Sequence, residues 1–219
     1  MVRFDNIDIA VDDPSVTLYT CNNANELVRM TEDGVPTAFT YDAWGRTSLK
    51  TKTGYASTYV YRSGDKLQRV DSTFPGEKAL VQYIHDGLGK RRLRTVDGTD
   101  KTFWRWNGWE EHAEYGAGSG GFWDMGDVAQ RTYLPGLGEA YPAGATPMAD
   151  YAYYTPDHLG SVRGIRGQDR SLSGSYAYEP YGQTRAASGL PLNVGYTGHL
   201  WDATIQQYFA PFRWHLVKP

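Results

Sequence analysis

Short runs of aromatic and aliphatic residues alternate with polar, glycine-containing turns along the chain, and the runs return at a steady interval. No long segment carries the apolar spacing of about 3.6 residues that an amphipathic helix needs. The third positions of the recurring segments are 20, 20 and 24 residues apart, and a weaker fifth copy begins at Trp104. This rhythm predicts short β-strands in a repeated arrangement. The four clear segments are Tyr19–Leu27, Phe39–Thr47, Tyr59–Leu67 and Tyr83–Arg91.

Each repeat has the composition of a β-hairpin. The first and third positions lie on one face of a strand, since side chains alternate, and most of them are aromatic. The fourth position is usually Asp or Asn, which starts a turn by hydrogen-bonding the nearby backbone. The seventh position is Gly, Asn or Asp, which tolerate the positive φ of a tight turn. The residues that carry this pattern most clearly are Tyr19, Asn25, Tyr41, Asp42, Gly45, Tyr61, Asp86 and Gly89.

One period therefore corresponds to two short strands and two turns. Since a single hairpin is marginal in water, successive hairpins are expected to share one sheet. We predict an all-β fold in which repeated antiparallel hairpins form a curved sheet or partial shell. Residues 1–150 form the repeat region, clearest over residues 17–115, and residues 151–219 form a second segment.

The composition agrees with many short strands, because 17 Tyr, 7 Trp and 25 Gly favour pleated surfaces and turns. The net charge of -3 disfavours nucleic acid and anionic lipid as partners. The five histidines show no metal-ligand spacing, so we expect neither a metal nor a cofactor. No apolar run of about 18 residues predicts a membrane span, and the first residues lack an apolar signal core.

The repeat columns resemble tyrosine-aspartate repeats, called YD or RHS repeats, and the second half of the chain carries more specific motifs. Tyr153–Arg163 resembles the motif that opens the RHS repeat-associated core domain. Tyr176–Gly182 resembles its Tyr-x-Tyr-Asp-Pro-Phe/Tyr-Gly step, with Glu179 in place of Asp, and Gly195–Arg213 resembles the next segment of that domain. The core-motif positions are Asp157, His158, Leu159, Gly160, Ser161, Tyr178, Pro180 and Gly182.

This resemblance, which covers about residues 17–213, implies a non-catalytic shell. Family members wind their hairpins into a hollow container, which in bacteria commonly holds a C-terminal toxin and in animal relatives carries adhesion modules. The core domain of bacterial members curls inward and plugs one end. The resemblance thus implies a secreted or cell-surface location, and a partner that is an enclosed toxin or the remaining shell repeats.

The chain departs from the family after Arg213, where the Asp-Pro-x-Gly stretch that supports self-cleavage is missing. Self-cleavage is therefore not carried over to any residue. We expect the core-like segment to be incomplete at its C-terminal end and the chain to be a piece of a larger shell.

Two other functions stay open. Trp104, Trp106 and Trp109 form a tryptophan-dense patch, and an exposed row of such rings would stack on sugars in a cell-surface carbohydrate-binding module. Packing under the sheet is the competing interpretation. A hydrolase or self-cleaving protease is disfavoured: Asp157, His158 and Ser161 supply triad letters, but an adjacent Asp and His point to opposite faces of a strand.

Overall fold

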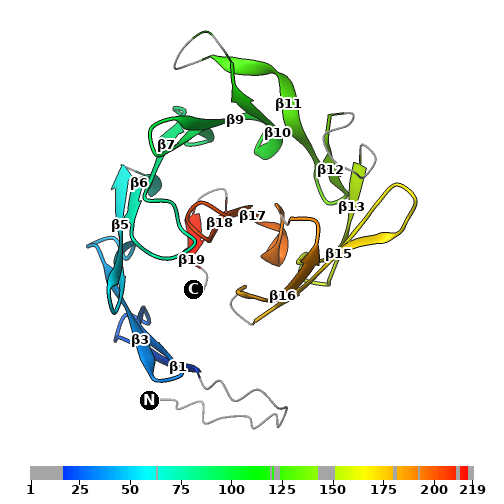
Figure 1. The fold of residues 1–219 in the computed structure, drawn as a ribbon. Coiled ribbons are helices and arrows are strands. Elements are labelled where there is room, and N and C mark those ends of the chain that lie inside the picture. Colours follow the sequence, from blue (N-terminus) through cyan, green and yellow to red (C-terminus); the bar gives the residue numbers. More distant parts are fainter. Residues whose placement is uncertain are drawn as a thin grey trace. The chain divides into compact units, whose positions relative to one another are not determined.

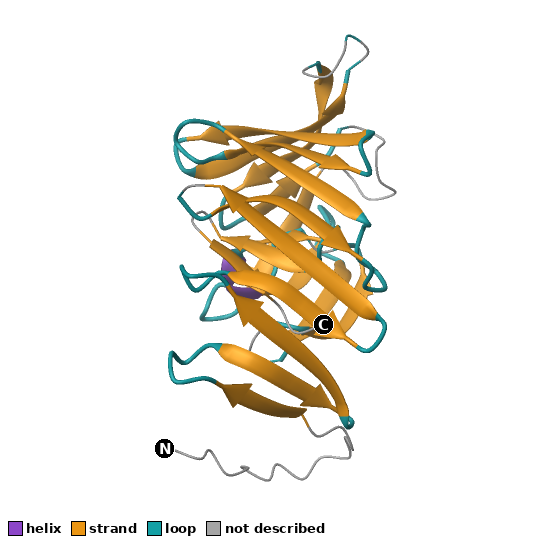
Figure 2. Ribbon diagram, turned by 90° about the vertical axis from the view of Figure 1, so that its left-hand side faces the viewer, coloured by secondary structure: helices purple, strands orange, loops and turns teal. Residues whose placement is uncertain are grey.

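The computed structural model describes residues 17–62, 64–118, 120, 124–142, 151–179, 182–191, 193–210 and 213–216. Over these residues the regular structure is β-strand apart from one short 3-10 helix, η1 (Tyr196–Gly198) (Figure 2). Within the same residues, no helix is long and apolar enough to cross a membrane. Pro180, one of the core-motif positions, lies outside the described residues.

The strands are β1 (Thr17–Cys21), β2 (Leu27–Glu32), β3 (Val35–Tyr41), β4 (Thr47–Lys52), β5 (Tyr55–Arg62), β6 (Lys66–Ser72), β7 (Leu80–His85), β8 (Arg91–Val96), β9 (Asp100–Asn107), β10 (Glu110–Ala117), β11 (Met125–Leu134), β12 (Gly138–Ala140), β13 (Tyr151–Pro156), β14 (Val162–Arg166), β15 (Leu172–Tyr178), β16 (Thr184–Gly189), β17 (Leu200–Asp202), β18 (Gln207–Ala210) and β19 (Arg213–Leu216).

The chain divides into two compact units, Met1–Ala56 and Ser57–Pro219. In the first unit, β1 to β4 pair antiparallel in chain order. In the second, β5 to β16 also follow one another in chain order, and β17, β18 and β19 form a separate small sheet. The predicted all-β fold of consecutive antiparallel hairpins is therefore confirmed. The domain boundary expected at residue 150 stays a prediction, and β12 and β13 pair directly across that position.

Every clear repeat contains one irregular step at the same place. The pairing register shifts immediately before the third repeat position, so that Tyr41 pairs with Thr47, a residue six positions later. Cys21, Tyr61 and His85 each pair six positions ahead in the same way. A bulge bends its strand and increases the local twist, so its repetition curves the sheet. The aligned positions thus occupy equivalent places in successive hairpins, as the sequence pattern predicts.

Where the fourth position is Asp or Asn, this residue builds the turn after the bulge, whereas the repeat Tyr59–Leu67 has Arg62 there. The Asp42 Oδ1 atom accepts hydrogen bonds from the backbone N–H groups two and four residues later, at 2.9 and 3.0 Å. Asn22, Asp86 and Asp157 make the same pair of bonds. Three residues after each of them the backbone enters the left-handed region, as at Gly45 with a φ of 75°.

In three hairpins an aromatic residue at the third position is hydrogen-bonded to the preceding hairpin. The Tyr41 hydroxyl donates to the Leu27 carbonyl at 2.7 Å, and the Tyr178 hydroxyl donates to the Val162 carbonyl at 2.8 Å. The indole N–H of Trp106, in the weaker fifth copy, donates a hydrogen bond to the Arg91 carbonyl at 2.6 Å. Each of these carbonyls lies just beyond the turn of the preceding hairpin. The tyrosine of the repeat therefore has a hydrogen-bonding role as well as an apolar one.

The core of the second unit lies on the inner side of its sheet, where β17 to β19 also lie (Figure 1). One buried cluster joins Tyr59, Leu67 and Tyr83 of the repeats to Ile205, which comes from the turn between β17 and β18. A second buried cluster contains Val162, Ile165 and Tyr176, with Val194 packed against it. The repeat sheet thus packs around a segment that is distant in sequence.

Candidate functional site

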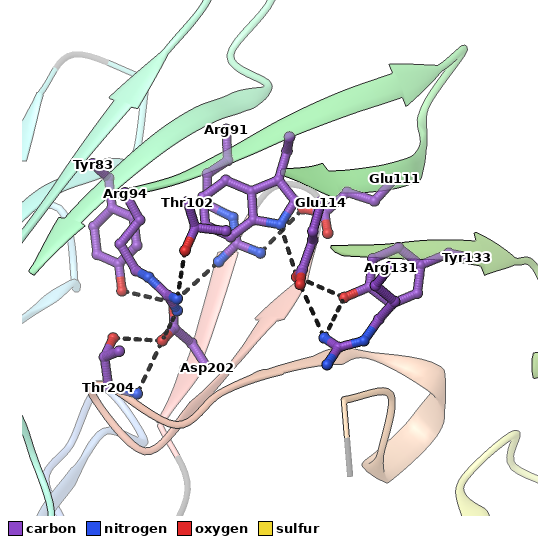
Figure 3. A network of polar contacts seen from close by, with 11 residues as sticks. Tyr83, Arg91, Arg94, Thr102, Glu111, Glu114, Arg131, Tyr133, Asp202 and Thr204 are labelled. Carbon is purple, nitrogen blue, oxygen red and sulfur yellow. Dashed lines mark hydrogen bonds and ion pairs between the residues drawn. The ribbon is translucent and has the colours of Figure 1, made fainter. Parts of the chain in front are cut away.

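A network of buried charged side chains connects the inner face of the sheet to the C-terminal segment (Figure 3). Asp202 at the end of β17 is 1% exposed. Its carboxylate accepts hydrogen bonds from Arg94 at 2.8 Å, from Tyr83 at 2.9 Å and from Arg91 at 3.2 Å. The Thr204 hydroxyl and backbone N–H complete its shell. Because both oxygens are bonded, the negative charge is stabilised despite its burial.

Arg91 lies at the centre of this network. Its guanidinium donates to Asp202 and, at 3.1 Å, to Glu111 of β10. The same group lies over the Trp104 ring, 3.8 Å from the centroid, and 4.5 Å from the centroid of Phe209. A guanidinium held between two rings and two carboxyl groups is fixed by cation–π contacts as well as by ion pairs. Arg91 therefore connects β8 and β10 to β17 and β18.

The network continues along the sheet through Glu114, Arg131 and Glu139. The Glu114 carboxylate accepts hydrogen bonds from Trp104, Tyr133 and Arg131 at 2.6 to 3.0 Å. The Arg131 Nε atom is 2.8 Å from the Glu139 carboxylate, which also accepts from Asn193 of the C-terminal segment at 3.0 Å. The sheet and the C-terminal segment thus share polar contacts at both ends of the network.

The charges of the network determine its protonation. Burial would raise the pKa of Asp202, but Arg94 and Arg91 together lower it below its ordinary value. Burial raises the pKa of Glu111 to about 7, and Arg91 offsets this effect only in part. Burial also raises the pKa of Glu139. The described members contain three guanidinium groups and four carboxyl groups, so the protonation of one carboxyl group balances the network.

This arrangement supports a structural role, in which the network attaches the C-terminal segment to the sheet. Each charged group is engaged by a neighbouring group of opposite charge or by a hydroxyl, and the guanidinium of Arg91 is covered by rings. Removing one partner from a buried ion pair typically costs about 3–5 kcal/mol, since the other charge is left buried. We refer to Arg91, Arg94, Glu111 and Asp202 as the buried clamp.

The sequence pattern does not identify the clamp. Arg91 is the last residue of an aligned repeat, and the repeat pattern assigns no role to Arg94 or Glu111. A charged residue at an inward-facing strand position, such as Arg91 or Glu111, could have indicated the clamp. Recognising such a position requires the register of the strand to be known. Asp202 appears in the sequence only within a motif, and nothing there places it beside β8.

The core-motif positions lie mostly in one turn and its contacts. Asp157 forms the turn between β13 and β14, while His158 and Leu159 are exposed at its tip. Gly160 has a φ of 83°. The buried Ser161 hydroxyl accepts a hydrogen bond from the Thr197 N–H at 3.0 Å. This turn is therefore also a contact with the C-terminal segment.

Gly182 contacts the same segment. Its φ is 88°, and a Cβ atom at this position would lie 2.7 Å from the Tyr196 ring. Tyr178 lies beside Tyr196, with ring centroids 5.8 Å apart. The core-motif residues that the structure describes thus hold the sheet against the segment around η1.

Of the two interpretations of the tryptophan patch, the structure contradicts an exposed row at Trp104 and agrees with packing under the sheet. That side chain is 2% exposed and is covered by Arg91, so it offers no face to a sugar. Trp106 is half-buried and meets Phe209 edge-on, with ring centroids 6.3 Å apart. Trp109, at the turn between β9 and β10, is 52% exposed. The three rings do not form one surface, and glycan binding by the other two stays a prediction.

Trp106 and Trp109 line a pocket of about 300 Å³. The turn between β11 and β12 forms another wall, from Leu134 to Gly138. Glu111 of the buried clamp, Tyr133 and Phe209 also line it. This pocket is near the lower limit of small-molecule sites, so its size suits one side chain or a small group.

Comparison with known proteins gives only distant matches. No protein-family model matches the chain, and no curated protein matches it. Solved structures that match include the TcdB2-TccC3-Cdc42 complex, with 11% identity and a TM-score of 0.41 over 92% of this chain and 15% of that chain. The Photorhabdus luminescens Tc holotoxin pore also matches, with 11% identity and a TM-score of 0.40 over 94% of this chain and 17% of that chain.

A third match, TcdB2-TccC3 without its hypervariable C-terminal region, has 12% identity and a TM-score of 0.39 over 94% of this chain and 16% of that chain. The chain thus spans less than a fifth of each of these solved chains. The fold and the buried clamp by themselves define the class: a β-hairpin repeat protein whose sheet is attached to its own C-terminal segment.

Proposed function

We propose that the chain is a non-catalytic part of a β-hairpin shell or scaffold that encloses or presents a partner polypeptide. The observation that carries this proposal is the order of the sheet. In the second unit β5 to β16 pair strictly in chain order, and the sheet already packs around one polypeptide segment, residues 193–210. A sheet built this way grows by adding hairpins, because each one contacts mainly its neighbours.

The finer proposal is that the shell is of the RHS or YD type and that its partner is a C-terminal toxin or further shell repeats. The aligned repeats and the core-like motifs support it. The turn between β13 and β14 supports it as well, because Asp157 and Ser161 act there as packing residues. A secreted or cell-surface location is part of the same proposal.

Native mass spectrometry of the protein from its own cells tests the shell function. We expect a second polypeptide, or further covalently continuous repeats, in a fixed ratio to the sheet. We expect that polypeptide to resist protease while the sheet is folded and to be cleaved once denaturant opens the sheet. A protein that is found alone, or a partner that is cleaved at the same rate in both states, would contradict the proposal.

The proposed absence of catalysis has its own test. The intact mass of the purified protein is expected to stay constant during prolonged incubation. A new pair of fragments that sums to the starting mass would show self-cleavage and would restore the protease alternative.

A further inference from the structure

The turns at one end of the strands of the second unit carry a row of exposed apolar side chains. Because the strands pair antiparallel in chain order, every turn that leads from an odd-numbered to an even-numbered strand lies at the same end of the strands. Four consecutive turns of this kind expose a large apolar residue at the tip. These residues are Leu88 (66% exposed), Trp109 (52%), Leu137 (65%) and Leu159 (58%), and we call them the apolar rim.

The position of these residues within the turn shows that the turn itself does not need them. Leu88 and Leu159 stand two residues after Asp86 and Asp157 and contribute their backbone N–H groups to the turn. Their side chains are not required for that bond. Two turns at the opposite ends of the strands, Asp97–Thr99 and Gly167–Ser171, consist of polar residues and glycine.

The rim residues are close enough to act together. Tips of successive hairpins are two strands apart, which is about 10 Å. Isolated exposed apolar residues are ordinary on a protein surface, but a contiguous apolar surface commonly marks a binding site. The four tips belong to consecutive hairpins, so a chain that lies along them can contact each in turn.

The pocket of about 300 Å³ lies within this rim, between Trp109 and the turn that carries Leu137. Its walls include the rings of Trp106, Trp109 and Tyr133. The C-terminal segment lines its other side, with His199 and Leu200 among the lining residues. A partner that lies along the rim would have one side chain over the pocket.

The charge of the pocket selects the chemistry of that side chain. Glu110 and Glu111 both line it. Glu111 is 6% exposed; its Oε1 atom is bonded to Arg91, whereas its Oε2 atom has no hydrogen-bond partner among the described residues. Lys90 of the chain itself lies over the Trp109 ring, 4.8 Å from the centroid, in a cation–π contact. Aromatic walls with carboxyl groups suit an aliphatic stem that ends in a positive charge.

We propose that the apolar rim docks a segment of the partner polypeptide in which a lysine or arginine, flanked by apolar residues, places its side chain in the pocket beside Trp109. This inference rests on the proposed function and names the surface and the chemistry by which the scaffold holds its partner.

Synthetic peptides test it directly. An extended chain covers about 10 Å in three residues, so leucines placed three residues before and after a central lysine match the spacing of the tips. Fluorescence anisotropy at pH 8, above the pKa of about 7 of Glu111, would compare this peptide with versions that carry arginine, norleucine or glutamate at the centre. We expect the lysine and arginine peptides to bind roughly tenfold more tightly than the norleucine peptide, and the glutamate peptide to bind least.

Variants of the protein locate the site. Glu111→Gln is expected to remove the preference for lysine over norleucine, while Trp109→Ala and Leu137→Ala weaken the binding of both peptides. The matched control is Trp44→Ala, which removes a tip residue that is 80% exposed at the equivalent position of the first unit, and which should leave binding unchanged. Thermal melts would show that each variant is folded, and the two surface variants decide the outcome if Glu111→Gln is not.

Three results would overturn the inference: equal binding of the lysine and norleucine peptides, no binding of any peptide, or a self-association of the protein that Leu137→Ser abolishes. The last result would assign the rim to a second copy of the chain. None of them bears on the native complex measured by mass spectrometry, so the shell function and this docking surface can fail independently.

Discussion

At the scale of single residues, the aspartate at the fourth repeat position has a defined task. Asp86 accepts the N–H groups of Leu88 and Lys90 through one oxygen atom. We expect Asp86→Ala to lower the free energy of unfolding by about 1–2 kcal/mol, since two backbone donors lose their acceptor. Asp86→Asn keeps that oxygen, as Asn22 does in the first repeat, and should be nearly neutral. Urea unfolding compares them, and equal losses would contradict this account of the turn.

At the third repeat position of the second unit, Tyr61 fits the column and His85 does not. It replaces the tyrosine of the third position, and its Nε2 atom is buried without a hydrogen-bond partner among the described residues. Burial lowers its pKa to about 4, with Arg91 and Lys66 adding to the effect, so it is neutral at pH 7. By analogy with Tyr178, a tyrosine here would place its hydroxyl at the Leu67 carbonyl.

We therefore expect His85→Tyr to raise the free energy of unfolding by about 1 kcal/mol, the typical net value of one hydrogen bond. The pocket that His85 lines, about 730 Å³ in volume, leaves room for the larger ring. Tyr178→Phe removes the equivalent bond and should lower the free energy of unfolding by a similar amount. Denaturant titration measures both, and a destabilised His85→Tyr variant would show that the column is not equivalent at this hairpin.

At the scale of elements, the sequence predicted the hairpins because their determinants are local. The Asp or Asn that makes the turn, the residue of positive φ three positions later and the aromatic on each strand are all read within nine residues. The aligned repeats did not include the later hairpins, which have the same bulge. The bulge also occurs before Pro156, Arg166 and Tyr178, which extends the repeat geometry into the segment that the sequence pattern separates from the repeats.

The clamp could not be predicted from the sequence because it depends on contacts between distant segments. Asp202 is more than a hundred residues from Arg91 and Arg94, and its position follows from how β17 to β19 fold back on the sheet. For the same reason the sequence could not decide between an exposed and a packed Trp104, since the ring is covered by Arg91 from another strand. The local sequence pattern shows on which face of a strand a side chain lies. The residues that it contacts on that face are determined by the tertiary fold.

Breaking the buried clamp should detach β17 and β18 from β8. We expect Asp202→Asn to cost about 3–5 kcal/mol, because the buried Arg91 and Arg94 lose their counter-charge. Hydrogen exchange should then accelerate in β17 and β18 and in β8, but not in β1 to β4 of the first unit. The control is Arg163→Gln, which removes an ion pair whose arginine is 42% exposed and should cost under about 1 kcal/mol. Uniformly faster exchange throughout both units would contradict a local clamp.

At the scale of the whole molecule, the buried carboxyl groups of the second unit make its stability depend on pH in two directions. Asp202 has a lowered pKa, so the folded state binds fewer protons there, and its contribution is present above its unfolded pKa and lost as the pH falls. Glu111 has a pKa raised from 4.5 to about 7, so the folded state binds more protons than the unfolded state between these values. Its contribution is present below pH 4.5 and lost as the pH rises through about 7.

The groups that face Glu111 come from three elements: Arg91 on β8, Glu114 on β10 and Asp202 on β17. Arg91 favours the ionised form, and the two carboxylates oppose it. Among the described members of the network, the carboxyl groups outnumber the guanidinium groups by one, so Glu111 is the group whose protonation restores balance when the others stay charged. A neutral isostere at this position should therefore be tolerated, with glutamine keeping the acceptor for Arg91.

We expect the free energy of unfolding of the second unit to fall by up to about 3 kcal/mol between pH 5 and pH 8 on account of Glu111, since each unit of pKa shift is worth about 1.4 kcal/mol. In Glu111→Gln that part of the fall should disappear, so the variant would match the original protein at pH 5 and exceed it at pH 8. Urea unfolding at both pH values, followed by hydrogen exchange in β10, measures the difference. Parallel losses in the two proteins would mean that Glu111 is already ionised in the folded state at pH 5, and the charge balance of the clamp would then lie elsewhere.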